Sequence, residues 1–167
     1  EHMLVNIGPQ HPATHGVLRL LVRTDGEIVH GVTAHIGYLH RCAEKIAEGC
    51  DWRQWMVYTD RFDYLAPINM NFGYAVAVER MLGVQVPERA QVIRVILAEL
   101  QRIGSHLVWL GTHATDLASQ SVLFYAIRER EHILNIFETI SGQRMMTSFI
   151  RPGGLWRDVT PDFEDAV

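Results

Sequence analysis

The sequence predicts an α+β protein in which a small N-terminal antiparallel sheet precedes a mostly antiparallel helical bundle. Residues 3–36 contain short segments rich in β-branched residues and leucine. From residue 37 onward, apolar residues instead recur at three- and four-residue steps. The 167 residues suit one domain, and their 48% hydrophobic content predicts a packed core. We expect residues 1–36 to form the sheet and 37–167 the bundle, together one truncated domain.

The sheet is expected to contain three strands. Residues 3–7 form the first, and residues 17–24 and 27–36 flank Asp25-Gly26, a dipeptide favoured in two-residue hairpin turns. Residues 8–12 contain two prolines and a glycine, so we expect a rigid loop there rather than a helix.

Prolines, glycines and a capping aspartate divide the remainder into five expected helices. Their ranges are 38–48, 51–61 with Asp51 as cap, 67–82, 87 to about 116, and 119–141. The long fourth helix is expected to bury one apolar stripe. That stripe comprises Ile93, Ile96, Leu97, Leu100, Ile103, Leu107 and Leu110. Residues 145–150 are expected to return to strand before a turn at 151–154, and acidic residues 161–167 have no evident core partner.

Composition excludes several classes of function. The net charge of −4 argues against a nucleic-acid surface, which carries a basic excess. Cys42 and Cys50 cannot supply a site that needs four cysteines. No apolar run approaches the roughly 18 residues of a membrane span, so we expect a soluble chain that is at most peripheral to a membrane.

The loop from His11 to His15 is the first candidate site. Two histidines four residues apart bind zinc from one helix face, but Pro12 makes a helix unfavourable here. Two alternatives remain: the histidines hydrogen-bond within the loop, or they form a titratable surface that faces a ligand near neutral pH.

Other candidates are single polar residues with two interpretations each. Tyr64 is either a core residue or an acid in a dry site, and Arg61 either pairs with Asp63 or faces a ligand. Asp116 at the end of the long helix opposes the helix dipole, so it is either solvated or compensated by a histidine. Arg41, expected one helical turn from Lys45, belongs by default to a solvated charged face.

Together these segments resemble one family, the 49-kDa subunit of respiratory complex I, also called its D-subunit. The opening Gly8-Pro9-Gln10-His11-Pro12-Ala13-Thr14-His15-Gly16-Val17-Leu18-Arg19 is similar to the family's signature. Further similarities follow in the family's order, at 37–41, 44–45, 61–65, 77–79, 105–107 and 142–144. The family's subunit is considerably longer, so the resemblance implies that this chain is its N-terminal portion.

The resemblance implies roles for five residues. His15 and Tyr64 are expected to face a quinone headgroup, and Asp116 to pair with that histidine. Arg41 and Arg61 are expected near a terminal iron–sulfur cluster held by cysteines of the neighbouring B-subunit. This chain would then bind no metal and no covalent cofactor of its own.

The implied function is that of the N-terminal part of the quinone-binding subunit of NADH–quinone oxidoreductase, with quinone as substrate and with electron transfer coupled to proton translocation. The implied partners are other complex I subunits, at the cytoplasmic side of a bacterial membrane, and the isolated chain is expected to be inactive. The alternative is a non-enzymatic helical module that binds another protein.

The family is also similar in fold to the large subunit of nickel–iron hydrogenases. In those enzymes cysteines bind the metals, but Asp63 and Ala66 stand at the corresponding places here. A carboxylate and a methyl group cannot replace bridging thiolates, which argues against hydrogenase activity. Met146 stands where some family members carry histidine, so we expect no proton coupling through that residue.

Overall fold

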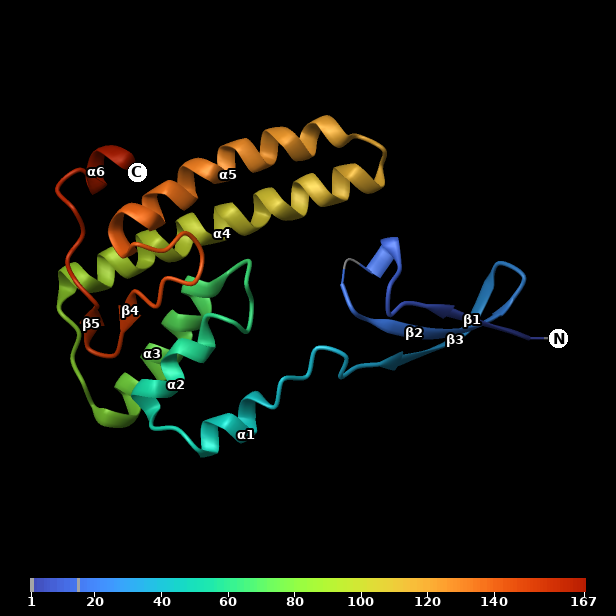
Figure 1. Ribbon diagram of the computed structural model, residues 1–167, viewed down its shortest axis with the longest axis horizontal. Coiled ribbons are helices and arrows are strands. Elements are labelled where there is room, and N and C mark those ends of the chain that lie inside the picture. The colour runs from blue at the N-terminus through green and yellow to red at the C-terminus, as the bar shows by residue number, and fades with distance from the viewer. Residues whose placement is uncertain (1, 15) are drawn as a thin grey trace. The chain divides into compact units, whose positions relative to one another are not determined.

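The computed structural model describes residues 2–14 and 16–167 (Figure 1). Their contacts divide the chain into two compact units, Glu1–Ile46 and Ala47–Val167. The predicted α+β class is confirmed, with a small antiparallel sheet in the first unit and helices dominating the second. None of the helices in the described part of the chain combines the length and hydrophobicity that crossing a bilayer requires.

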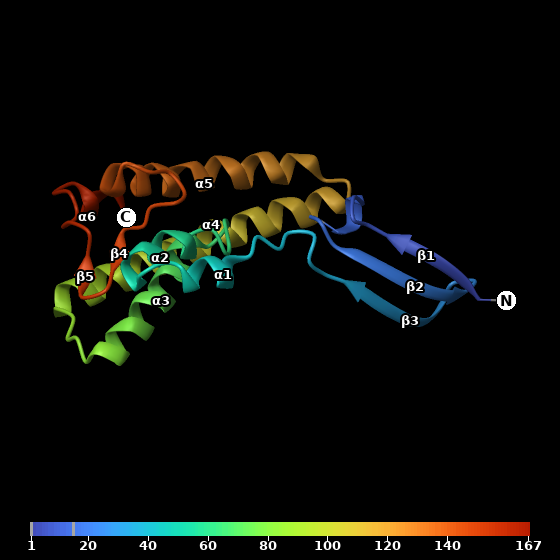
Figure 2. The same cartoon turned by 60° about the horizontal axis from the view of Figure 1, so that its bottom comes forward.

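The first unit is built on a three-stranded antiparallel sheet in the order β1-β2-β3 (Figures 1 and 2). The strands are β1 (Met3–Ile7), β2 (Arg19–Asp25) and β3 (Ile28–His35), and the single-turn 3₁₀ helix η1 covers Pro12–Thr14.

The hairpin between β2 and β3 turns one residue later than predicted. Asp25 pairs with Ile28, so the two loop residues are Gly26 and Glu27. Gly26 takes the first loop position because its φ of +60° is open to glycine at little cost. Gly8 has a different constraint, since a β-carbon there would lie 1.8 Å from the carbonyl oxygen of Leu18.

The first predicted helix is shorter than expected. Helix α1 spans only Ala43–Glu48, because Cys42 adopts a positive φ of +54° and the amide of His40 instead closes a turn onto the carbonyl of Gly37. Arg41 therefore lies outside the helix, and the prediction that it shares a helix face with Lys45 is wrong.

In the second unit, helix α2 (Trp52–Thr59) has the predicted cap. One carboxylate oxygen of Asp51 accepts hydrogen bonds from the amides of Arg53 and Gln54, at 2.7 and 2.9 Å. The side chain of Gln54 accepts a return bond from the Asp51 amide at 3.2 Å, which completes a capping box. The helix ends at Thr59, two residues before the predicted limit.

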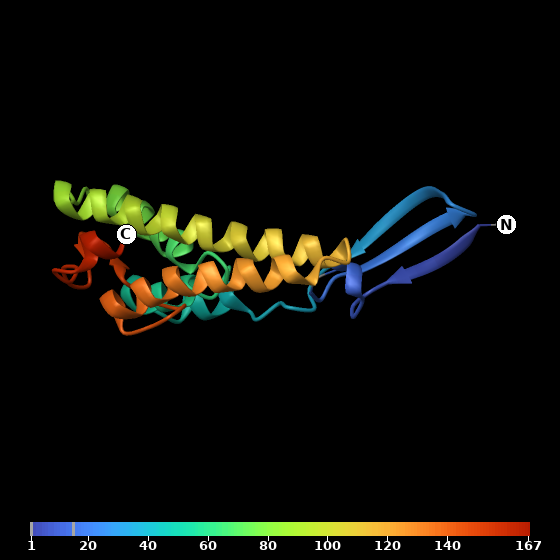
Figure 3. The same cartoon turned by 90° about the horizontal axis from the view of Figure 1, so that it is seen from above.

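Three longer helices follow: α3 (Pro67–Leu82), α4 (Glu88–Asp116) and α5 (Gln120–Ser141). Their bounds agree closely with prediction. Helices α4 and α5 form an antiparallel hairpin and lie side by side in all three views (Figures 1, 2 and 3). Helix α3 packs on the first half of α4, so the core lies there rather than along the whole hairpin.

The core consists of apolar side chains from α2, α3, α4 and α5, from residues 149–150 and from the C-terminal segment. Its members are Met56, Ile68, Ala75, Ile93, Leu97, Ile133, Leu134, Phe137, Ile140, Phe149, Ile150 and Phe163. Phe163, in the short helix α6 (Phe163–Ala166), is 4% exposed. The expectation that residues 161–167 have no core partner is therefore wrong.

The predicted apolar stripe of α4 is confirmed in the first half of the helix and at Leu107, and is wrong at Ile103 and Leu110. Ile93 and Leu97 are buried, whereas Ile103 is 51% and Leu110 is 47% exposed. In the second half, the buried positions include Gly104 and Gly111, so α5 approaches α4 over small residues. Ile103 and Leu110 are thereby turned away from the contact, whereas Leu107 is partly buried and packs against the core.

The segment before the C-terminal hairpin is not the predicted strand. Only Ile150 of residues 145–150 is in a strand, β4 (Ile150–Arg151), which pairs with β5 (Gly154–Leu155). Side-chain contacts of Arg144 and Ser148, described below, hold this segment in an irregular conformation instead.

Candidate functional site

The turn between α2 and α3, residues 60–66, presents the candidate residues of the second unit. The amides of Arg61 and Phe62 close the end of α2 onto the carbonyls of Tyr58 and Thr59, at 3.0 and 3.2 Å. Asp63 then accepts a hydrogen bond from the Leu65 amide through its side chain, at 2.9 Å. A side chain that accepts from an amide two residues on is a typical aspartate turn, which gives this segment a defined local conformation.

Two buried side chains attach this turn to the rest of the unit. Asp60, which is fully buried, accepts hydrogen bonds from the amide and hydroxyl groups of Ser148 at 2.8 and 2.5 Å. At the other end of the turn, the amide nitrogen of the Gln101 side chain on α4 donates to the carbonyl of Leu65 at 2.8 Å. The turn is therefore held at both ends.

Tyr64 lies between these two anchors and is 56% exposed. The neighbouring Phe62 is 51% exposed, so the turn displays two aromatic rings. The alternative that Tyr64 is a core residue is therefore wrong for this chain. A tyrosine on a firmly held turn can offer its hydroxyl in one orientation, which suits hydrogen bonding to a ligand.

Burial raises the pKa of Asp60 above its ordinary value, against the opposing effects of the Ser148 hydrogen bonds and the charges of Arg61 and Arg151. Arg61 donates to the carbonyl of Val57 at 2.6 Å and lies 3.9 Å from the bonded carboxylate oxygen of Asp60. Its guanidinium is thus fixed beside the turn, with its side chain 39% exposed.

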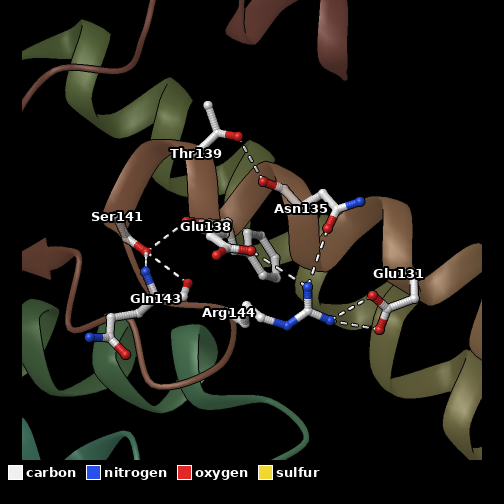
Figure 4. A network of polar contacts seen from close by, with 8 residues as sticks. Glu131, Asn135, Glu138, Thr139, Ser141, Gln143 and Arg144 are labelled. Carbon is white, nitrogen blue, oxygen red and sulfur yellow. Dashed lines mark hydrogen bonds and ion pairs between the residues drawn. The ribbon is translucent and has the colours of Figure 1, made fainter.

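The segment 142–149, which carries Met146, is held against α5 by Arg144 (Figure 4). Arg144 donates to both carboxylate oxygens of Glu131, at 2.7 and 2.6 Å, and to the side chain of Asn135 at 3.3 Å. Its second nitrogen lies 3.5 Å from Glu138. The hydrogen bonds and charge of Glu131 raise the pKa of Arg144, so this side chain stays cationic.

The same segment shares its anchor with the 60–66 turn. Met146 is half-buried, and Ser148 two residues later donates to Asp60. The hydrogen bonds between Ser148 and Asp60 therefore join the segment that carries Met146 to the turn that carries Tyr64.

Asp116 is the last residue of α4 and is exposed. Because Leu65 is bonded to Gln101, the 60–66 turn faces α4 fifteen residues before Asp116. At 1.5 Å of rise per residue, this places Asp116 about 22 Å farther along the helix axis. Tyr64 and Asp116 therefore belong to the same unit, but the turn that carries Tyr64 lies beside the middle of α4, whereas Asp116 is at its C-terminal end.

The two remaining predicted residues belong to the first unit. Arg41 is exposed in the turn before α1. His15 lies outside the described residues. The convergence of His15 with Tyr64 and Asp116 therefore stays a prediction.

Both cysteines are free thiols, Cys42 exposed and Cys50 half-buried. Cys42 lies beside His40, whose ring nitrogen accepts a hydrogen bond from the Cys42 amide at 3.3 Å.

Sequence reasoning assigned no role to the anchoring residues Asp60, Gln101 and Ser148. The sequence does contain a signal for Gln101. It lies four residues after Leu97, as Leu97 lies four after Ile93, so a polar residue occupies the next position of the apolar stripe. A polar residue on a buried stripe indicates an internal hydrogen bond. No comparable pattern marks Ser148, whose partner is 88 residues away.

Known proteins resemble the chain over its full length. It is 57% identical to the NADH-quinone oxidoreductase D-subunit of Geotalea uraniireducens over 167 residues, which are 100% of this chain and 43% of that relative. It is 59% identical over 167 residues to the D-subunit numbered 2 of Chloroflexus aurantiacus, again over 100% of this chain and 41% of that relative. The D-subunit numbered 1 of Roseiflexus castenholzii is also 59% identical, with 100% and 40% covered.

The chain thus spans about two fifths of the length of these relatives. In addition, residues 116–167 match the family model described as the respiratory-chain NADH dehydrogenase 49 Kd subunit. The identity over every residue of the chain and the match to the family model agree with the motifs found in the sequence. The chain belongs to the family of the NADH-quinone oxidoreductase D-subunit, the 49-kDa subunit of complex I.

Proposed function

We propose that this chain forms part of the quinone-reducing region of NADH–quinone oxidoreductase and presents Tyr64 to the quinone. The single observation that supports this most directly is the 60–66 turn, which is anchored at Asp60 and Leu65 while Tyr64 remains 56% exposed. The high identity to relatives named as the D-subunit of that enzyme supports the same assignment.

Reduction of a quinone to a quinol requires two electrons and two protons. In this proposal Tyr64 donates a hydrogen bond, and then a proton, to one quinone oxygen. Protonated His15 donates a hydrogen bond and a proton to the other quinone oxygen. Asp116 positions His15 and favours its cationic form.

Electrons would come one at a time from a terminal iron–sulfur cluster held by the neighbouring B-subunit. Arg61 and Arg41 would lie near that cluster, where a guanidinium favours the more negative reduced state by electrostatic attraction. Arg61 suits this role because its contacts with Val57 and Asp60 fix the position of its charge.

The wider assignment follows from the family. We propose that the complete protein assembles with the cluster-bearing B-subunit and other complex I subunits, at the cytoplasmic side of a bacterial membrane, and takes part in proton translocation. A fold related to the large subunit of nickel–iron hydrogenases belongs to the same proposal.

The decisive experiment measures quinone reductase activity of the assembled complex carrying Tyr64→Phe or His15→Ala. Each change is expected to lower turnover by about 10²-fold, the usual contribution of a positioned proton donor. Tyr125→Phe is the matched control, since that hydroxyl is on a similarly exposed ring of α5, and should leave turnover unchanged.

Assembly is followed in parallel by native gel and cluster content. Full activity of both site variants would refute the proposed quinone contacts. If the chain acted only as an interaction module, the variants would lose activity only in proportion to the loss of assembly. Fully assembled variant complexes would then keep full activity.

A further inference from the structure

Three polar side chains gather at one end of the N-terminal sheet, one from each strand or its immediate start. They are His2 just before β1, Asp25 at the end of β2 and His30 in β3. Their candidate ligand atoms all lie within 4.8 Å of one another, and the two imidazole rings are 4.6 Å apart between centroids. All three side chains are exposed and so accessible from solvent.

The register of the sheet explains why these residues lie close together. Met3 pairs with Thr24, so continuing the register places His2 beside Asp25. Asp25 pairs with Ile28, and His30 follows two residues later in β3, with its ligand atom within 4.8 Å of those of Asp25 and His2.

An irregularity in β3 gives His30 its special position. Arg23 pairs with Gly31 and Thr24 with Val29, so His30 is an extra residue with no cross-strand partner on β2. Such a bulge bends the strand and redirects a side chain, and bulges are over-represented at functional sites. The bulge therefore leaves the His30 ring beside His2, not stacked over a β2 side chain.

The donor set suits a borderline transition metal. Two imidazole nitrogens and one carboxylate oxygen are the protein ligands of many zinc sites, with bonds of about 2.0–2.2 Å and a fourth position left for water. Tetrahedral bonds of that length place neighbouring ligand atoms roughly 3.4 Å apart. The ligand atoms of the three residues lie within 4.8 Å of one another. Rotation of these exposed side chains can shorten the separations to the tetrahedral value without moving the strands.

We propose that His2, Asp25 and His30 form a binding site for a divalent transition metal ion, Zn²⁺ in the first instance. The prediction from sequence that this chain binds no metal rested on the His11–His15 loop, the cysteine count, the residues Asp63 and Ala66 and the family resemblance, and it did not group His2, Asp25 and His30. The site is independent of the quinone proposal, because no residue of the 60–66 turn contributes to it.

Charge and geometry set what the site should prefer. Mg²⁺ favours oxygen donors, so a site with two imidazoles should discriminate against it. The Arg23 side chain reaches over Gly31, with a nitrogen 3.5 Å from the position a β-carbon would take there. That charge opposes a bound cation, so Asp25 is needed to offset it.

A bound ion would also connect all three strands. Because the three ligands come together only in the folded sheet, Zn²⁺ should stabilise the fold by mass action. His2 is the sole ligand from the β1 side, so the ion would hold that strand to the hairpin formed by β2 and β3.

The test uses the full-length subunit, stripped of metal with a chelator and titrated with ZnSO₄ against a chromophoric competitor. The wild type is expected to bind one Zn²⁺ that both His30→Ala and Asp25→Asn weaken by at least tenfold. His35→Ala is the control, an exposed histidine on the same strand that belongs to no such three-residue group in the described chain. It should leave the affinity unchanged.

Substitution with Co²⁺ gives a second readout that does not depend on folding alone. The visible absorption of a tetrahedral Co²⁺ site should appear in the wild type and in His35→Ala and be lost in His30→Ala, with circular dichroism showing that each variant is folded. Equal Zn²⁺ affinity in wild type, His30→Ala and Asp25→Asn would overturn the proposal, as would binding of Mg²⁺ as tight as that of Zn²⁺.

Discussion

Ser148 donates both its amide and its hydroxyl hydrogen to the same carboxylate oxygen of Asp60, at 2.8 and 2.5 Å. This pair joins the end of α2 to the segment that precedes β4, across 88 residues of sequence. The second oxygen of Asp60 is buried and has no hydrogen-bond partner in the described chain. The contact therefore secures the candidate site while leaving its carboxylate poorly solvated.

Ser148→Ala tests the strength of this connection. Loss of the hydroxyl removes one of two donors to a buried carboxylate, so the free energy of unfolding should fall by about 1.5–3 kcal/mol. Chemical denaturation of the purified protein measures this. Ser105→Ala removes a hydroxyl that only bonds the preceding turn of α4 and should change the same quantity by less than about 0.5 kcal/mol. Equal effects of the two changes would contradict a special role for Ser148.

Asp60→Asn tests the raised pKa of Asp60, which burial causes. A carboxyl group whose pKa is higher in the folded than in the unfolded protein binds its proton more tightly when folded. Its contribution to stability is therefore greatest at low pH and declines as the pH rises from 3.8, the ordinary value, through the folded pKa.

The amide of asparagine does not titrate, so this decline should disappear in Asp60→Asn. The free energy of unfolding of the variant relative to the wild type is expected to increase with pH over that window and then level off. Denaturation at a series of pH values gives the curve. A difference that stays flat, or that runs in the opposite direction, would show that Asp60 is not held at a raised pKa.

Arg94→Met tests the buried ion pair beneath the C-terminal hairpin. Arg94 donates to both oxygens of Glu79, at 3.1 and 2.6 Å, and also to the carbonyls of Arg151 and Gly154. The side chains of the pair are only 2% and 8% exposed. Removing the arginine leaves a buried carboxylate without its counter-charge, which should cost about 3–5 kcal/mol of unfolding free energy.

Arg102→Met provides the comparison, because Arg102 pairs with Glu99 on the surface with both side chains more than half exposed. That change should cost at most about 1 kcal/mol. A small effect of Arg94→Met would mean that Glu79 finds other donors or water.

The pair should also respond to pH in the sense opposite to Asp60. Burial alone would raise the pKa of Glu79, but the hydrogen bonds from Arg94 and the Gly153 amide, with the charge of Arg94, lower it. The stability it contributes is therefore present above the ordinary pKa of 4.5 and is lost as the pH falls through the lower folded pKa. Glu79→Gln should abolish this acid-side loss, measured by denaturation below about pH 5.

Gln101→Leu tests whether the 60–66 turn depends on its anchor to α4. The change leaves the carbonyl of Leu65 without its donor, so the turn should open more often. Amide hydrogen exchange of residues 61–66 is expected to speed up several-fold while exchange in α5 stays constant. Gln91→Leu is the matched control, since Gln91 makes the same kind of bond to Val86 at the start of α4. If both variants exchange residues 61–66 at the wild-type rate, the anchor is not what holds Tyr64.

The helices could be predicted because their ends are marked locally. Asp51, Pro67, Gly83 and Gly142 each act within a turn or two of their own position, and all four bound helices where expected. The predicted start of the first helix was wrong because nothing in the sequence near Cys42 signals its positive φ.

The site was predicted less completely because its supports are distant in sequence. Tyr64 was singled out through its motif, yet Ser148 and Gln101, which hold its turn, are 88 residues from Asp60 and 36 from Leu65 respectively. The burial of α4 was misjudged for a related reason. Apolar spacing treats the helix as having one uniform neighbour, whereas the fully buried apolar core residues of α4 lie in its first half and, of the stripe in the second half, only Leu107 packs against the core.

The contact between α4 and α5 gives a final prediction that compares two helical glycines. A β-carbon on Gly111 would lie 2.8 Å from a methyl of Leu123 and 3.1 Å from its α-carbon, so part of the obstruction is backbone. On Gly73 of α3, a β-carbon would meet nothing described within 4 Å. Alanine favours a helix over glycine by about 1 kcal/mol in both places, so only the packing differs.

We therefore expect Gly111→Ala to lower the free energy of unfolding by about 1–3 kcal/mol, because α5 must move away from α4. Gly73→Ala should raise it by about 0.5–1 kcal/mol, because the unfolded chain loses freedom and the helix gains a better former. Denaturation of both variants under one set of conditions makes the comparison. A stabilising Gly111→Ala would mean that the two helices are not held at the close approach that turns Ile103 and Leu110 outward.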